Sequence, residues 1–298
     1  MSILRRLDTL NQIKLRDGRT LAYAEYGSRQ GAPIVHCHGA PSSHVEGEFL
    51  FERTLLLELG VRLILPDRPG ISRSDFQAGR RIADWPNDVV ELADALGLRT
   101  FAVLGESGGS PYALACATTI PSRVTAVGIV GGVAPFEAPG LTAAMSAPLR
   151  LMFRLAKYAP PLLDVLFRLN LRMTRSMDER GAERMTSRFP EPDRTLLKRP
   201  DILQGFIGCF QEACVNGTRG AVHDMSLIAR PWGIDPATIT VPAFLWHGER
   251  DANVPAAHGR YLSKLIPSCR ATFFPDDAHL SVPLRHAREI LSALSVEQ

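Results

Sequence analysis

Residues 101–119, FAVLGESGGSPYALACATT, contain the pattern that decides the fold. The apolar run Phe101–Gly105 fits a fully buried strand, and Ser110–Thr119 fits a helix. The turn between them has the pattern G-x-S-x-G, with the strand and the helix on either side that this motif requires. A serine on so tight a turn has a strained backbone and points its Oγ above the sheet, where side chains at Gly105 and Gly109 would collide. The stretch therefore predicts a nucleophilic Ser107; the alternative is a glycine-rich turn that only packs.

The rest of the chain alternates short β-type runs with helical patterns. This alternation favours an α/β fold with a mostly parallel sheet and helices on both faces. Asp17-Gly18 predicts a hairpin turn between the first two strands. Asp84 is expected to cap a helix that ends before Gly97. Eight strands are predicted, at residues 13–15, 20–26, 33–38, 62–67, 101–105, 125–130, 241–246 and 271–274.

The pattern changes between Pro135 and Trp232. Apolar residues there recur at helical spacing, prolines punctuate the stretch, and β-type runs are almost absent. We therefore expect residues 1–134 and 233–298 to form one α/β core domain. Residues 135–232 are expected to form a helical cap inserted into it.

A serine hydroxyl needs a base, and the imidazole that supplies it needs a carboxylate to fix its tautomer. His279 follows the last predicted strand, and Asp251 follows the strand that ends at Trp246. Both therefore lie at carboxyl ends of strands, where ligands bind in open α/β sheets. The strand before them ends in Gly131-Gly-Val-Ala134, which offers no carboxylate. Asp224 is the runner-up for the acid. The histidines expected to pack or to face solvent are His36, His223, His247, His258 and His286.

An acyl-transfer site also needs donors for a developing oxyanion. The backbone N–H groups of Ala40 and Gly108 are the candidates, because Ala40 follows the third strand and Gly108 follows the nucleophile. The alternative for residues 38–41 is a plain strand-to-loop turn. His36, Cys37 and His38 cannot ligate one ion, because successive strand residues point to opposite faces. No metal and no cofactor is predicted.

On these residues the chain resembles the α/β-hydrolase superfamily, in its capped bacterial branch. The resemblance rests on His38-Gly39, Pro66-Asp-Arg-Pro-Gly70 with Ser74-Asp75, the motif around Ser107, the Asp251 loop and His279. It implies a Ser–His–Asp triad in the chain order Ser107, Asp251, His279, and a helical cap between strands six and seven. The family usually has glycine before the catalytic histidine, whereas this chain has Ala278. Relatives that open epoxides or displace halide have Asp at the nucleophile position, so Ser107 argues against both reactions.

Three functions remain open at this stage. The first is hydrolysis of a carboxylic ester of a small-molecule acyl substrate through an acyl-enzyme, the chemistry of a serine esterase. The second uses the same triad for C–C bond hydrolysis, lactone opening or a biosynthetic tailoring step, which fold and triad do not separate. The third is a non-enzymatic receptor that binds a ligand under its cap.

Composition excludes several partners. The net charge of +3 and the lack of a nucleic-acid motif argue against nucleic acid. The first eight residues are followed by no apolar region of a secretory signal, and no apolar run is long enough to span a bilayer. Five cysteines without a CxxC pair favour free thiols and a cytoplasmic location. We expect no membrane partner, and a homodimer stays open.

The predicted cap is rich in cations: residues 145–199 carry a dozen Arg and Lys against half as many acids. These charges form a solvated helix face or attract an anionic substrate. We expect the apolar side chains of the same stretch to roof a pocket or to pack on the core. They are Leu149, Leu151, Met152, Phe153, Leu163, Val165, Leu166, Phe167 and Leu169.

Overall fold

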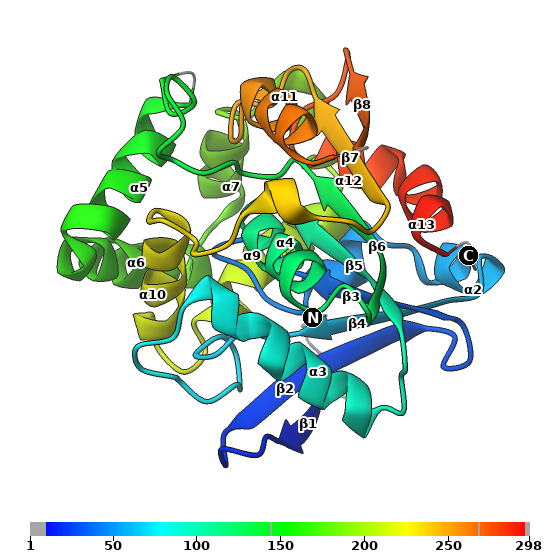
Figure 1. The fold of residues 1–298 in the computed structure, drawn as a ribbon. Coiled ribbons are helices and arrows are strands. Elements are labelled where there is room, and N and C mark those ends of the chain that lie inside the picture. Colours follow the sequence, from blue (N-terminus) through cyan, green and yellow to red (C-terminus); the bar gives the residue numbers. More distant parts are fainter. Residues whose placement is uncertain (1–9, 144, 268, 296–298) are drawn as a thin grey trace.

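A computed structural model describes residues 10–143, 145–267 and 269–295. The predicted eight-stranded, mostly parallel sheet is confirmed, with the strand order β1-β2-β4-β3-β5-β6-β7-β8 (Figure 1). Its strands are β1 (Leu10–Lys14), β2 (Thr20–Gly27), β3 (Ala32–Cys37), β4 (Val61–Pro66), β5 (Phe101–Glu106), β6 (Val124–Val130), β7 (Ala243–Gly248) and β8 (Arg270–Phe274).

Only the first three strands in this order pair antiparallel. β1 and β2 form the predicted hairpin, with Lys14 opposite Thr20, and Gly18 takes the left-handed φ of +85° that its turn requires. From β4 to β8 every pair is parallel. Parallel pairs need crossover connections, and helices supply them. The carboxyl ends of β3, β5, β6, β7 and β8 therefore share one edge of the sheet.

Helices cover both faces, and β5 shows why. Its residues are all buried, and they alternate between two hydrophobic clusters: Val103 belongs to one, and Ala102 and Leu104 belong to the other. The first cluster includes α3 (Trp85–Ala95), α4 (Ser110–Thr119) and α11 (Ala256–Leu265). The second includes α1 (Glu46–Leu50), α2 (Arg53–Glu58), α12 (Ser281–Arg285) and α13 (Ala287–Ser295).

Between β6 and β7 the described residues form helices and no strand. These are α5 (Ala147–Tyr158), α6 (Pro160–Arg175), α7 (Glu179–Thr186), α8 (Glu191–Leu196), α9 (Pro200–Ala213) and α10 (Arg219–Ile228). We call residues 135–232 the helical segment. Figure 1 shows α5, α6 and α10 together at one side of the sheet. Phe153, Phe167 and Met225 join the first core cluster, so the helical segment packs directly on the sheet domain.

Near the end of the described chain α12 and α13 are separate helices, because the chain bends at His286, which has non-helical angles and pairs through Nε2 with Asp277 Oδ2 at 2.8 Å. Asp84 precedes α3 as predicted but does not cap it. Its carboxylate accepts from the Arg81 backbone N–H and side chain instead, within a short 3-10 turn, Ile82–Asp84. Gly97 follows α3 with φ of +70°, as predicted.

The apolar side chains of the helical segment were predicted to roof a pocket or to pack on the core, and only some of them are buried. Phe153, Leu163 and Phe167 are buried. Leu151, Val165, Leu166 and Leu169 are between 46% and 54% exposed. They project from the outer side of α5 and α6, because one helix can bury only one face against a core. Within the described ranges, no helix combines the length and the apolar character needed to cross a bilayer.

Candidate active site

Ser107 lies on a sharp turn between β5 and α4, at the shared edge of the parallel strands. Its φ is +51°, a left-handed value that residues other than glycine rarely adopt. The flanking glycines leave no room for a side chain. A Cβ on Gly109 would lie 1.9 Å from the Cys37 carbonyl oxygen, and one on Gly105 would lie 2.7 Å from Ser110 Cα. The close approach of β3 to this turn therefore requires glycine and forces Ser107 out above the sheet.

His279 and Asp251 come together from two loops, as the sequence predicts. The His279 Nδ1–H donates to Asp251 Oδ2 at 2.6 Å. The other carboxylate oxygen, Asp251 Oδ1, accepts from the backbone N–H groups of Asn253 and Val254, each at 2.8 Å. Asp251 therefore holds the imidazole ring by its Nδ1 side and leaves Nε2 for another partner.

The environment of His279 favours its charged form. Burial alone would disfavour the imidazolium, but the Asp251 carboxylate outweighs it and raises the pKa of His279 to about 10. Glu106 and Asp193 add to this effect. The imidazole therefore stays protonated to high pH, and only its neutral form can accept a proton from a hydroxyl.

The side chains around Gly39 connect Ser107 to this pair through Glu106. A Cβ on Gly39 would lie 2.5 Å from Glu106 Oε2 and 3.5 Å from Ser107 Cβ. The other oxygen, Glu106 Oε1, lies 3.6 Å from His279 Nε2. Among the described residues, Ser107 Oγ and His279 form no direct hydrogen bond. Such bonds are often long before a substrate binds and shorten in the complex.

The two expected oxyanion donors are also neighbours. A Cβ on Gly108 would lie 3.1 Å from the Ala40 backbone nitrogen and 2.8 Å from Ala40 Cβ. Gly108 therefore allows the backbone of residue 40 to approach the turn. An oxyanion hole needs two N–H groups that serve the same oxygen atom, and this approach of residue 40 to residue 108 meets one requirement for it.

Sequence reasoning missed a buried pair of carboxylates next to the nucleophile. Glu46 accepts from the Gly39 N–H through both oxygens, at 2.9 and 3.1 Å, and Glu46 Oε2 lies 3.2 Å from His36 Nε2. Glu106 approaches the same face of Gly39, since a Cβ there would lie 2.5 Å from Glu106 Oε2 and 3.0 Å from Glu46 Oε1. Burial and then the charge of Glu46 raise the pKa of Glu106 to about 8. A glutamate at the end of a fully buried strand, directly before Ser107, was the signal that could have identified it.

The site also includes a residue of the helical segment that no sequence pattern indicated. Asp193 of α8 is fully buried and accepts three backbone hydrogen bonds, from the N–H groups of His279 at 3.0 Å, Leu280 at 3.0 Å and Ser281 at 2.9 Å. It therefore fixes the loop that carries the imidazole. Nothing in the local sequence connects it to a residue 86 positions away.

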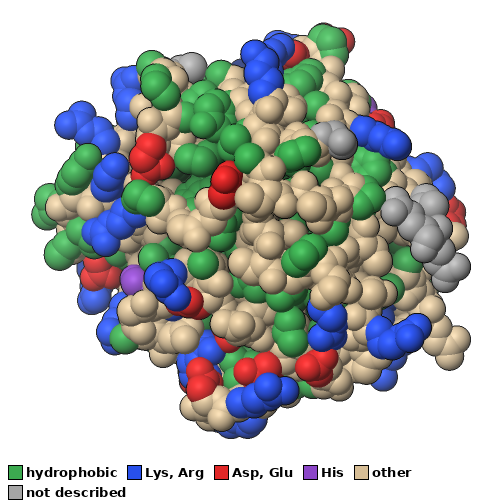
Figure 2. Space-filling view, in the orientation of Figure 1, with side chains coloured by type: hydrophobic (Ala, Val, Ile, Leu, Met, Phe, Trp, Pro, Cys, Tyr) green, Lys and Arg blue, Asp and Glu red, His purple; other side chains and the backbone are tan. Residues whose placement is uncertain are grey.

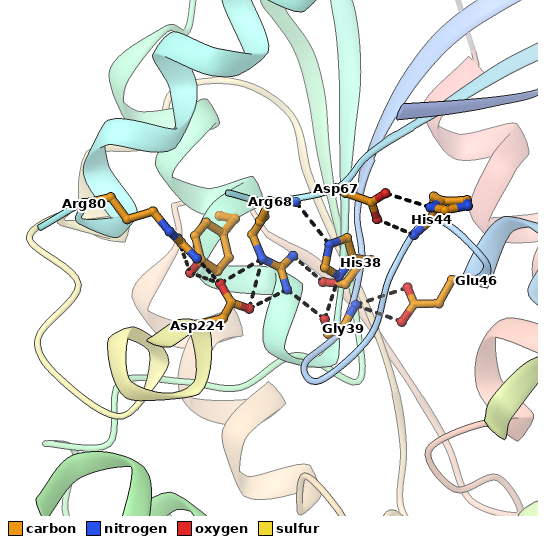
Figure 3. A network of polar contacts seen from close by, with 9 residues as sticks. His38, Gly39, His44, Glu46, Asp67, Arg68, Arg80 and Asp224 are labelled. Carbon is orange, nitrogen blue, oxygen red and sulfur yellow. Dashed lines mark hydrogen bonds and ion pairs between the residues drawn. The ribbon is translucent and has the colours of Figure 1, made fainter. Parts of the chain in front are cut away.

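The alternative prediction, that Asp224 is the acid that orients a catalytic histidine, does not fit its contacts. Figure 3 shows its carboxylate bound to Arg68 and Arg80, in a network that reaches Gly39 through Arg68. It also accepts from the Tyr112 hydroxyl at 2.6 Å. Arg68 also contacts the loop after β3, where its Nη2 donates to the Gly39 carbonyl at 2.7 Å. Asp224 thus anchors α10 to that loop and has no histidine to orient.

The other candidates have partners of their own. His247 Nε2 bonds the Val254 carbonyl at 2.7 Å, and His258 bonds the backbone of Ala134 and Leu141. Each packs inside the protein, as predicted for these two. All five cysteines are free thiols. In the part of the chain that the structure describes, His, Cys, Asp and Glu form no group that could hold a metal ion.

Comparison with known proteins agrees with this architecture. A family model described as alpha/beta hydrolase fold matches residues 32–285. An uncharacterized hydrolase of Bacillus subtilis, YcgS, is 33% identical over 117 residues, 39% of either protein. The chain thus spans less than half the length of the first curated relatives it matches.

Two further matches extend over most of the chain. The 2-hydroxy-6-oxo-6-phenylhexa-2,4-dienoate hydrolase of Burkholderia cepacia is 25% identical over 84% of this chain and 82% of its own length. Among solved structures, a thermophilic esterase from Thermogutta terrifontis superposes with a TM-score of 0.67 at 21% identity. That superposition covers 96% of this chain and 99% of the other.

Proposed function

The chain belongs to the α/β-hydrolase fold family, and from that premise we propose that it is a serine hydrolase that cleaves a carboxylic ester or a related acyl bond. One observation carries the proposal. An imidazole that donates to a buried carboxylate at 2.6 Å has its Nε2 3.6 Å from Glu106, the residue directly before a serine with φ of +51°. That combination activates a hydroxyl for attack on a carbonyl carbon.

The proposed reaction has two halves. Ser107 Oγ attacks the carbonyl carbon while its proton passes to His279 Nε2, and Asp251 stabilises the resulting imidazolium. The N–H groups of Ala40 and Gly108 bind the oxyanion, and each such donor typically contributes about 10²–10³ in rate. The intermediate then expels the alcohol, which takes the proton from His279. Water next attacks the acyl-serine by the same route, so the acid leaves and Ser107 regains its proton.

The Thermogutta terrifontis protein supports this choice of bond, since it is named as an esterase and shares the fold over nearly the whole chain. A second candidate is hydrolysis of a C–C bond next to a ketone. It is favoured by the Burkholderia cepacia relative, whose name gives a 6-oxo acid and which aligns over 84% of this chain. Lactone opening and a biosynthetic tailoring step use the same residues in the same roles.

The experiment compares hydrolysis of p-nitrophenyl esters of increasing acyl length by the wild type and by Ser107→Ala. We expect Ser107→Ala to lose at least about 10³-fold in kcat. Ser187→Ala, an exposed serine at the end of α7, is the matched control and should keep full activity. Fluorophosphonate labelling with peptide mapping should modify Ser107.

Three outcomes discriminate the alternatives. Labelling at another residue, or equal rates for wild type and Ser107→Ala, rules the proposal out. Turnover of a 6-oxo-hexa-2,4-dienoic acid but of no ester selects the C–C candidate. Ligand binding without turnover of any of these compounds selects a receptor of the same fold.

A further inference from the structure

Helix α6 is apolar on two sides. Leu163, Phe167 and Leu171 are buried against the rest of the protein. We define the outer face of α6 as five exposed side chains, each between 46% and 60% accessible: Leu162, Val165, Leu166, Leu169 and Met173. Their spacings of three and four form one continuous stripe along the helix. Stripes of this kind on a protein surface mark sites of interaction.

The neighbouring helix extends this surface. Tyr158, at the end of α5, is 75% exposed, and Leu151 is 54% exposed. α5 and α6 pack together at the edge of the molecule (Figure 1). In Figure 2 the same edge shows hydrophobic side chains interleaved with Lys and Arg.

The charge around the outer face is one-sided. Residues 145–177 contain six Arg and Lys and a single acid, Asp164. That acid is already engaged: Oδ1 accepts from the Thr218 hydroxyl at 2.5 Å, and Oδ2 accepts from Arg168 Nε at 2.8 Å. Arg154, Arg172 and Arg175 are exposed. Within α5 and α6 themselves the stripe is therefore accompanied by six cations and one acid.

We propose that the outer face of α6, with Leu151 and Tyr158, docks on the surface of an anionic lipid bilayer. Apolar side chains of an amphipathic helix enter the boundary between headgroups and acyl chains, and flanking Arg and Lys bind anionic headgroups. A bilayer deforms around a convex helix, so this face needs no groove of matching shape on its partner.

A second copy of the chain fits less well. A two-fold contact through this face would set the same cations against each other, and the one carboxylate of α5 and α6, Asp164, already has partners. The inference also replaces the expectation of no membrane partner. That expectation rested on the lack of a long apolar run, whereas surface docking requires only a stripe on one helix.

The docking face contains none of the proposed catalytic residues, so the inference does not depend on the proposed function. Vesicle flotation tests it directly. The wild type and Ser107→Ala should both float with vesicles of phosphatidylcholine and phosphatidylglycerol at low salt. Both should bind vesicles of phosphatidylcholine alone much more weakly, and 0.5 M NaCl should reduce binding to the anionic vesicles.

Two variants separate the stripe from general surface hydrophobicity. The double variant Leu166→Ser/Leu169→Ser should bind anionic vesicles at least about tenfold more weakly, because two leucines no longer enter the interface. Leu57→Ser, which changes a leucine of α2 that is 50% exposed, is the matched control and should bind like the wild type. Unchanged thermal unfolding of both variants shows that folding is intact.

Other results overturn the proposal. If the protein binds neutral and anionic vesicles equally, the cations do not select an anionic bilayer and the proposal fails. If Leu57→Ser loses as much binding as the double variant, the outer face of α6 has no special role. A dimer in sedimentation velocity that Leu166→Ser/Leu169→Ser abolishes, with no vesicle binding by the wild type, assigns the face to a second copy instead.

Discussion

The Asp193 carboxylate, on a helix of the segment inserted between β6 and β7, accepts a 3.0 Å hydrogen bond from the backbone N–H of His279. The proposed general base is therefore held from two sides. Asp251 orients its ring, and Asp193 fixes its backbone together with the two residues that follow. An inserted helix thus supports a loop of the sheet domain, so changes in one part affect the geometry of the other.

Replacing Asp193 tests this support. Asp193→Ala leaves three buried N–H groups without their acceptor, which costs about 1–3 kcal/mol for each group that water does not reach. We expect kcat to fall by tenfold or more. The acidic limb of the pH–rate profile should also move to lower pH, because the Asp193 charge helps to raise the pKa of His279. Asp201→Ala, at an exposed residue, should change neither. A rise in KM alone, with an unmoved pH profile, would contradict the positioning role.

The pH dependence of activity should reflect the basic His279. Catalysis needs its neutral form, and Asp251 raises its pKa from 6.5 to about 10 despite burial. Because a raised pKa keeps the imidazole protonated to higher pH, kcat/KM should increase with pH well above 6.5. Initial rates between pH 6 and 10.5, corrected for spontaneous hydrolysis, give this limb. If the acidic limb has its midpoint at or below pH 6.5, the Asp251 carboxylate does not raise the pKa of His279 in solution.

Glu106→Gln tests whether the buried carboxylate next to Ser107, which the sequence analysis did not identify, affects the pKa of His279. Burial and the charge of Glu46 keep Glu106 protonated until about pH 8, and above that pH its negative charge 3.6 Å from Nε2 stabilises the imidazolium. Removing this charge should lower the pKa of His279, so the acidic limb should shift to lower pH. Glu249→Gln, an exposed glutamate that pairs with Arg260, is the control and should leave the limb in place. If the acidic limb of the pH–rate profile does not shift in Glu106→Gln, Glu106 stays neutral over the whole pH range of the measurement.

Asp224→Asn should destabilise the protein. Although burial opposes ionisation, Arg68 and Arg80 hold the pKa of Asp224 well below its usual range. Its stabilising charge is thus complete above about pH 4, the usual pKa of a free aspartate, and is lost as the pH falls further. Removing it leaves two buried guanidinium groups poorly compensated, which typically costs about 3–5 kcal/mol.

Urea unfolding at pH 7 measures this cost. Asp94→Asn breaks the exposed pair with Arg123 and should change the free energy of unfolding by less than about 1 kcal/mol. Equal effects of the two substitutions would show that the buried network contributes no more than a surface pair.

Gly109→Ala should abolish the turn that carries Ser107. The added Cβ would meet the Cys37 carbonyl oxygen at 1.9 Å, and a backbone atom of a central strand cannot yield. We expect a large loss of activity together with a lower melting temperature. Gly208→Ala, in helix α9, meets no atom closer than 3.8 Å and should be neutral or stabilise by up to about 1 kcal/mol. Full activity of Gly109→Ala would require the turn to have another geometry.

The amino-acid sequence by itself determined the sheet and the position of the serine. Alternating apolar runs, the Asp17-Gly18 turn and the glycines around Ser107 are local patterns, and each has one favourable backbone geometry. Asp251 and His279 were also predictable, because each follows a strand and the carboxyl ends of parallel strands share one edge.

Only the tertiary structure decided what surrounds them. Asp193 and Glu46 carry no local signal, since their role depends on which backbone amides lie within 3 Å after folding. Asp224 has the residue type of a catalytic acid, and only its contact with two buried arginines excludes it. The apolar residues of α6 are alike in sequence. Which of them face the core and which face outward depends on how the helix is rotated against its neighbours, and long-range packing sets that rotation.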